Sequence, residues 1–197
     1  ACLADEVIAG MEPYLDHPRC VALGEIGFNL TTANEERAFV RQLLLAKGRK
    51  MPVIIHLPHT DKLRGAKRIA EIIRAEKADV DRIVIDHNTE ETIRLSRETG
   101  CFSGMTVYPI SKLTPERVAD IIREYGAERM IVNSSADWGV SDPLSLVKVV
   151  NHLQAKGFAP ETIQKLVFDN AMALYSHSPN WKPDFTLQPI DPHLFQR

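Results

Sequence analysis

The chain of 197 residues has few cysteines and no long hydrophobic run. Its three cysteines, Cys2, Cys20 and Cys101, are too few and too scattered for a disulfide framework or a cysteine zinc cage. No segment approaches the roughly 18 consecutive apolar residues of a membrane span, and the N-terminus shows no signal-peptide pattern. These absences predict a globular protein of a reducing, cytoplasmic compartment, without a membrane partner.

The sequence also lacks an excess of charge of one sign. Its formal net charge is -2, so the charge balance does not indicate a nucleic-acid surface, although a local basic groove stays open as an alternative. A glycine-rich phosphate-binding turn after a strand is absent too. An open α/β sheet that binds a nucleotide is therefore the weakest of the interpretations.

Short apolar runs alternate with amphipathic segments along the chain. The runs are typical of strands buried on both faces and cover residues 21–25, 52–56, 83–87, 102–108 and 130–137. The spacing predicts helices over residues 3–15, 34–47, 62–77, 90–99, 115–125, 143–156 and 160–175. Such alternation predicts a parallel sheet with right-handed crossovers. Five units form either an open doubly wound sheet or part of a barrel, since a full barrel needs about 250 residues.

Local signals suggest where two of these helices begin and end. Asn34 is the expected N-cap of the second helix, and because Arg37 follows three positions later, no capping box is predicted. Gly48 is the expected end of that helix. Thr114 is the expected cap of the fifth helix, which Pro115 opens.

The composition divides the chain into two parts. We predict a barrel-type domain over residues 1–177 and a proline-rich strap over residues 178–197. The strap carries Trp181, Phe185 and Phe195, which we expect to hold it on the domain. Free disorder is the alternative, but disordered tails are poor in aromatic residues.

Four of the apolar runs end in a side chain that can bind a metal ion: Glu25, His56, His87 and Asp137. The carboxyl ends of parallel strands gather at one rim. Because side chains alternate along a strand, Glu25 is expected to share a face with Leu23, and His87 with Ile85. We expect these shared faces to point into the barrel. Imidazole with carboxylate suits Zn, Mn, Fe or Ni, and a carboxylate can bridge two ions in hydrolases that activate water.

Each candidate ligand also has a simpler interpretation. With 26 acidic residues and seven histidines in the chain, polar residues at the ends of runs also arise by chance. Taken alone, His56 is typical of a histidine at a loop edge, Glu25 of a turn carboxylate and Asp137 of an Asx-type turn. The ordered set is more specific than any member.

Further polar and aromatic residues near the run ends allow two interpretations each. His59 is either a substrate contact or a solvent-facing loop residue, and Trp138 either walls the pocket or caps the barrel. Asp86 is expected on the opposite face of its strand from His87, which favours a structural pairing. Lys62 and Lys112 either bind an anionic substrate group or are solvated helix-start charges.

Five motifs occur in a recognisable order: Gly24-Glu25-Ile26-Gly27, Pro52–His56, Asp86-His87, Ser135–Trp138 and Asn170-Ala171. In this order they resemble the motifs of TatD-related hydrolases, which belong to the metal-dependent amidohydrolase superfamily. The resemblance covers about residues 18–177. It implies a TIM-barrel-like (β/α) fold, with about five of the eight strand–helix units present. It also implies one or two divalent ions, from among Zn, Mn, Mg, Ni and Fe.

The resemblance further implies roles for the four ligands. Glu25 would bridge the metals, His56 and His87 would ligate one of them, and Asp137 would ligate the other and handle the proton of the attacking water. The implied reaction is hydrolysis of a phosphoester, amide or lactone in a small-molecule or phosphoester substrate. His59 and Trp138 are then candidate substrate contacts.

The sequence departs from the family at its start. The histidine–any–histidine strand that opens the family has no match, because His17 stands alone. We therefore expect that the chain lacks the N-terminal part of the native protein. If the chain were complete, a non-catalytic barrel-like binding or scaffold protein would be the favoured alternative.

Overall fold

The computed structural model describes residues 2–135 and 140–183, and within these ranges the strands form one parallel sheet. The strands are β1 (Leu23–Gly27), β2 (Val53–His56), β3 (Ile83–Asp86), β4 (Phe102–Val107) and β5 (Met130–Ser134). Their order in the sheet is their order in the chain. A doubly wound sheet reverses direction at a switch point, whereas a barrel adds each strand on the same side. The topology is therefore of the barrel type.

Helices connect these strands as the alternation predicted. They are α1 (Cys2–Leu15), α2 (Ala33–Arg49), α3 (Lys62–Ala75), α4 (Ile93–Glu98), α5 (Pro115–Tyr125), α6 (Ser145–Ala155), α7 (Pro160–Gln164) and α8 (Asn170–Ser176). A π-helical turn over Lys165–Asp169 joins α7 to α8, within the one helix predicted over residues 160–175. Among the described residues, no helix is long and apolar enough to cross a membrane.

The start of α2 differs from the prediction. Thr32, not Asn34, is the N-cap, and it forms a capping box with Glu35. The Glu35 carboxylate also accepts the backbone N–H groups of Asn29 and Leu30, so the preceding loop wraps around it. The prediction was wrong because it placed the first turn too late. At the other end, α2 passes Gly48 and ends at Lys50, which adopts a left-handed conformation (φ 55°).

The outer face of the sheet packs against the surrounding helices. The cluster over β1–β3 joins strand residues to α2 and α3 and includes Leu23, Ile55, Ile85, Phe39 and Ile69. The cluster over β4 and β5 joins α5 and α6 and includes Met105, Val132, Val118 and Leu153. These two clusters form most of the core and hold the strands in register.

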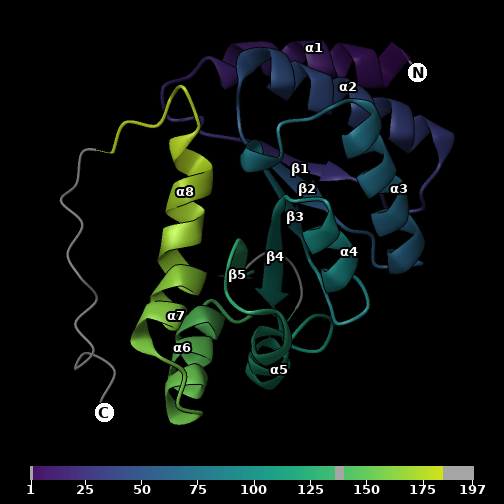
Figure 1. Ribbon diagram of the computed structural model, residues 1–197. Helices are drawn as coiled ribbons and strands as arrows, with labels where there is room; N and C mark the ends of the chain where they lie inside the picture. Colours follow the sequence, from purple (N-terminus) through teal and green to yellow (C-terminus); the bar gives the residue numbers. More distant parts are fainter. Residues whose placement is uncertain (1, 136–139, 184–197) are drawn as a thin grey trace.

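The inner face carries a smaller apolar layer that α8 closes. Val84, Phe102 and Ile131 pack there against Leu174 of α8. The Asn170 amide donates to the carbonyls of Ala127 (2.8 Å) and Met130 (2.6 Å), which fixes α8 at the start of β5. In Figure 1, α8 runs beside β5, on the opposite side from α2 and α3.

The described part of the C-terminal segment contacts the domain. Trp181 stacks on Tyr175, with 6.4 Å between the ring centroids. The Asn180 amide donates to the carbonyls of Leu15, His17 and Cys20. Residues 184–197 lie outside the described residues, so the division into a domain over 1–177 and a strap over 178–197 stays a prediction.

Replacing Leu174 with alanine tests the closure of the inner face by α8. The Leu174 side chain is fully buried, so Leu174→Ala is expected to destabilise the protein by about 2–5 kcal/mol. Leu144→Ala is the control, because Leu144 is 60% exposed. Urea unfolding of the purified chain measures both. Equal stability of the two variants would contradict this packing.

Candidate metal centre

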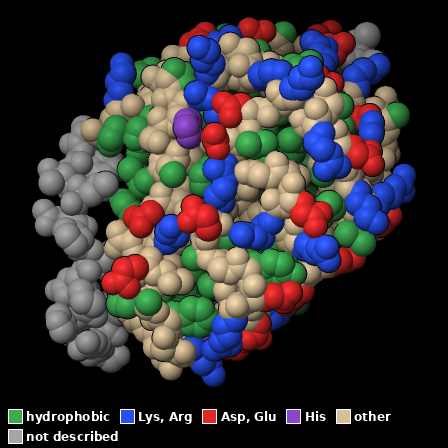
Figure 2. Space-filling model, in the orientation of Figure 1, with side chains coloured by type: hydrophobic (Ala, Val, Ile, Leu, Met, Phe, Trp, Pro, Cys, Tyr) green, Lys and Arg blue, Asp and Glu red, His purple; other side chains and the backbone are tan. Residues whose placement is uncertain are grey.

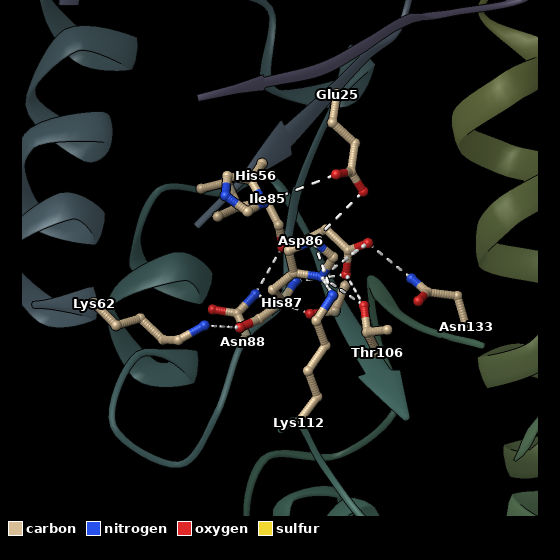
Figure 3. A network of polar contacts seen from close by, with 11 residues as sticks. Glu25, His56, Lys62, Ile85, Asp86, His87, Asn88, Thr106, Lys112 and Asn133 are labelled. Atoms are coloured by element: carbon tan, nitrogen blue, oxygen red, sulfur yellow. Dashed lines mark hydrogen bonds and ion pairs between the residues drawn. The ribbon is translucent and has the colours of Figure 1, made fainter. Parts of the chain in front are cut away.

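Three side chains meet at the carboxyl ends of β1, β2 and β3. Glu25, His56 and His87 each offer a ligand atom, and these atoms lie within 4.8 Å of one another. The Glu25 carboxylate is 3.8 Å from His56 Nδ1 and 3.4 Å from His87 Nε2. The two imidazole rings meet edge to face, with 5.0 Å between centroids. Figure 3 shows Glu25 reaching toward both histidines.

Glu25 reaches the centre because β1 is irregular. Leu23 pairs with Val53 and Ile26 with Ile55, so two residues of β1 stand opposite one residue of β2. Such a bulge re-aims a side chain. The expectation that Leu23 and Glu25 share the inward face was wrong, because Leu23 packs in the outer cluster. The bulge lets Glu25 face inward after an outward Leu23.

His87 reaches the centre through a second irregularity. Ile85 lies in the outer cluster, so regular alternation would turn His87 outward as well. Instead, His87 follows the end of β3 in a left-handed conformation, with φ of 64°. The expectation that Ile85 and His87 share an inward face was therefore wrong. Asp86 is paired as predicted, with Thr106 and Asn133. It occupies the inner face, however, so the expectation that Asp86 and His87 lie on opposite faces was wrong.

The close approach of β1 to β2 explains the second glycine of the Gly-Glu-Ile-Gly motif. A Cβ atom on Gly27 would lie 2.2 Å from the carbonyl oxygen of His56, far inside van der Waals contact. Gly27 pairs with His56 in the sheet. Glycine at this position therefore lets β1 approach the strand that carries the second ligand.

The protonation states of Glu25 and His56 suit a cation. The pKa of Glu25 is lowered, chiefly by its hydrogen-bonding contact with His87. Burial, followed by the charge of His87, lowers the pKa of His56 to about 4. At neutral pH the site thus presents a carboxylate and a neutral imidazole. Moreover, His56 Nδ1 is buried without a hydrogen-bond partner, as expected of an atom placed to bind something else.

The centre lies in the wall of a cavity of about 590 Å³, which His59, Tyr108, Ile110 and Lys112 also line. The His59 ring is 6.0 Å from that of His56. The Lys112 ammonium lies 3.3 Å from each ring nitrogen of His87. One strand end that bears a carboxylate and two that bear imidazoles, with open space beside them, match a catalytic rather than a closed structural metal site.

A second lysine stands behind His87. The Lys62 ammonium donates to the backbone carbonyl of His87 at 2.8 Å, and burial lowers the pKa of Lys62 to about 8. The interpretation of Lys62 and Lys112 as solvated helix-start charges was wrong, since both contact His87. Lys62, His87 and Lys112 lie far apart in the sequence, and only the fold brings these three residues together.

Two of the predicted site residues cannot be placed. Asp137 and Trp138 follow β5 and lie outside the described residues, so their roles stay predictions. By contrast, Thr106 was missed, although it hydrogen-bonds to His87 Nδ1 at 2.7 Å. A polar residue in the middle of the buried run 102–108 was the one signal that could have indicated it.

Comparison with known proteins agrees with the resemblance found in the sequence. A family model described as TatD related DNase matches residues 3–176. An uncharacterized metal-dependent hydrolase of Methanocaldococcus jannaschii is 32% identical over 169 residues, covering 86% of this chain and 66% of that protein. The chain thus spans just under two thirds of the length of that relative.

Two solved structures share the fold. The TatD-like protein from Archaeoglobus fulgidus superposes with a TM-score of 0.67 at 32% identity, over 85% of this chain and 65% of that one. A TatD homolog from Escherichia coli K12 gives a TM-score of 0.58 at 19% identity, over 88% of this chain and 70% of that one. These similarities confirm the predicted TIM-barrel-like α/β fold class.

Replacing His56 and, in a second variant, His59 distinguishes a metal ligand from a residue that only lines the same cavity. His56→Ala is expected to weaken binding of Zn²⁺ by more than about 100-fold, because losing a ligand costs more than the 10–100-fold loss seen for outer partners. His59→Ala keeps near-normal affinity, since His59 is not among the three clustered donors. Competition with a chromophoric chelator measures both constants. Similar affinities in the two variants would contradict the assignment.

The lowered pKa of His56 predicts a pH dependence of stability in the metal-free protein. The unfolded chain binds a proton at His56 near pH 6.5, whereas the folded protein does so only near pH 4. The stabilisation by neutral His56 is therefore fully present above about pH 6.5 and is lost as the pH falls toward 4. It amounts to ~3 kcal/mol at 1.36 kcal/mol per pKa unit.

Urea unfolding of the metal-free protein and of His56→Gln, from pH 7 to pH 4, measures this effect. The stability advantage of the wild type over the variant is expected to shrink across that range. His17→Gln, at an exposed loop position, controls for the loss of a histidine. A difference between wild type and His56→Gln that does not change with pH would disprove the linkage.

Proposed function

The chain belongs to the TatD-related DNase family, and from this premise we propose that it carries the centre of a divalent-metal-dependent hydrolase acting on phosphoesters. The observation that carries the proposal is the convergence of Glu25, His56 and His87 beside an open cavity. The donor set, one carboxylate and two imidazoles, fits Zn²⁺, Mn²⁺, Fe²⁺ or Ni²⁺. Mg²⁺ fits less well, because it prefers oxygen ligands.

The protein's own residues prepare this site for a cation and an anionic substrate. Glu25 is held ionised beside His87, and His56 is kept neutral by burial. A divalent ion held by these groups would supply a water of lowered pKa and would polarise the scissile bond. Asp137, carried over from the family motif, would accept the proton of the attacking water.

Positive charge beside the cavity favours a phosphoester over a neutral amide or lactone. The Lys112 ammonium lines the cavity, and the Lys62 ammonium lies behind His87, so the wall that carries the centre holds two positive groups. The family is described as a DNase family, and DNA is a phosphoester substrate. We therefore assign Lys112 to bind a non-bridging phosphate oxygen, and His59 to line the substrate's path.

The size of the substrate is a separate part of the proposal. On the face drawn in Figure 2, Lys and Arg side chains are interspersed with Asp and Glu. A long nucleic acid is bound along a continuous basic track. The described residues on the face in Figure 2 do not form such a track. A long duplex is therefore not expected to bind along this face.

The competing function is a barrel-like binding or scaffold protein that keeps the polar strand ends without catalysis. It predicts no metal-dependent turnover of any substrate class. Assays of purified protein with a phosphoester, an amide and a lactone, each with and without a chelator, distinguish the two functions.

Changing Glu25 tests the hydrolase directly. Glu25→Gln is expected to lower kcat/KM for the phosphoester by about 100-fold or more, which corresponds to ~3 kcal/mol of transition-state stabilisation. Glu98→Gln, in an exposed pair with Arg94 on α4, is the matched control and keeps full activity. A phosphoesterase activity that survives both the chelator and Glu25→Gln would refute the proposal.

A further inference from the structure

A buried chain of polar groups leads away from His87 on the side opposite Glu25. Thr106 Oγ1 lies 2.7 Å from His87 Nδ1 and 3.2 Å from Asp86 Oδ1. All three side chains are buried, with relative exposures of 6%, 2% and 5% for His87, Thr106 and Asp86. Figure 3 shows Asp86 beside His87 and Thr106 next to both, with Thr106 further from Glu25.

The direction of these hydrogen bonds follows from what surrounds Asp86. Its Oδ1 accepts the backbone N–H of His87 at 2.6 Å, and its Oδ2 accepts the amide of Asn133 at 3.0 Å. Both oxygens therefore act as acceptors, as in a carboxylate. The single hydroxyl proton of Thr106 is donated to Asp86, which leaves the lone pairs of Thr106 Oγ1 to accept a hydrogen bond from His87 Nδ1–H.

Asp86 cannot easily move from this position. A Cβ atom on the facing Gly104 would lie only 2.4 Å from Asp86 Oδ1. The absence of a side chain at Gly104 thus provides the space that the carboxylate fills. Contacts from β3, β4 and β5 hold the group, so its orientation is set by the sheet itself.

We propose that Asp86, acting through Thr106, keeps a proton on Nδ1 of His87 and thereby makes Nε2 the metal-binding nitrogen. Asp86 and Thr106 are then positioning residues. Nε2 is the nitrogen that lies 3.4 Å from Glu25 Oε1, on the cluster side of the ring. The inference rests on the proposed metal-binding function and adds the groups that fix its third ligand.

The two histidines differ in this respect. His87 has its outer nitrogen, Nδ1, engaged by Thr106, whereas His56 faces Glu25 through Nδ1, and that nitrogen is buried without a hydrogen-bond partner. A histidine ligand is usually fixed by a hydrogen bond from its other ring nitrogen, and losing that bond typically weakens metal binding about 10–100-fold. The structure thus assigns the outer support of the centre to His87, through Thr106.

Substitutions at Thr106 test this assignment. Thr106→Val keeps the shape but removes the hydroxyl, and it is expected to weaken Zn²⁺ binding by about 10–100-fold. Thr106→Ser restores the hydroxyl and is expected to restore the affinity. Ser103→Ala is the matched control, because Ser103 lies in the same strand and its buried hydroxyl has no partner. Competition with a chromophoric chelator gives the constants without any activity assay.

A spectroscopic measurement tests the tautomer itself. In nitrogen-15 NMR of the zinc-loaded wild type, His87 is expected to show a protonated Nδ1 and a metal-bound Nε2. A metal-bound or unprotonated Nδ1 would overturn the proposal even if Thr106→Val failed to fold. Equal zinc affinities of wild type, Thr106→Val and Thr106→Ser would overturn it as well.

The same measurements separate this inference from the proposed function. If the wild type binds no Zn²⁺, the metal-dependent function fails. The metal-free spectrum then still decides the hydrogen-bond chain: a proton on Nδ1 that is lost or moves in Thr106→Val supports it, and an Nδ1 without a proton refutes it. If zinc binds and Nδ1 is unprotonated, the function stands and the inference fails.

Discussion

The departure of β1 from regular alternation is the constraint on which the centre depends. Without the bulge, Glu25 would follow Leu23 to the outer face, where α2 covers the sheet. The close contact of Gly27 with the His56 carbonyl brings β1 near enough for the carboxylate to reach both imidazoles. Glu25 therefore reaches the histidines because β1 is irregular at one point, and His87 reaches them through its left-handed conformation after β3.

The inner face of the sheet has two layers: an apolar layer that stabilises the fold and a polar layer that holds the groups behind the metal ligands. An apolar layer, with Phe102 and Ile131 against Leu174, closes the end of the sheet near α8. A polar layer begins one step further along the strands, where Thr106 and Asn133 both donate hydrogen bonds to Asp86. Because strands of one parallel sheet supply both layers, the packing that stabilises the fold also fixes the groups behind the ligands. This arrangement is the rigid support that a metal site requires.

Much of the fold could be predicted from the sequence. The alternation of apolar runs and amphipathic segments predicted parallel strands joined by helices, because period and composition are local properties. The ends of the helices were predicted less accurately. The capping box of α2 was missed, since it depends on how the loop wraps around Glu35. The choice between a barrel and a doubly wound sheet needed the strand order, which no local pattern contains.

The sequence by itself determined which residue types stand at the carboxyl ends of the strands, and so the family and the kind of metal chemistry. Only the tertiary structure decided which of them meet. Glu25 and His87 do face inward as predicted, but regular alternation is not the reason. A bulge in β1 turns Glu25 inward, and a left-handed backbone conformation turns His87 inward. The link from His87 to Thr106 joins residues 19 positions apart. Such contacts exist only after crossovers bring separate strands together, since side-chain direction and distance across a sheet are not written in any one segment.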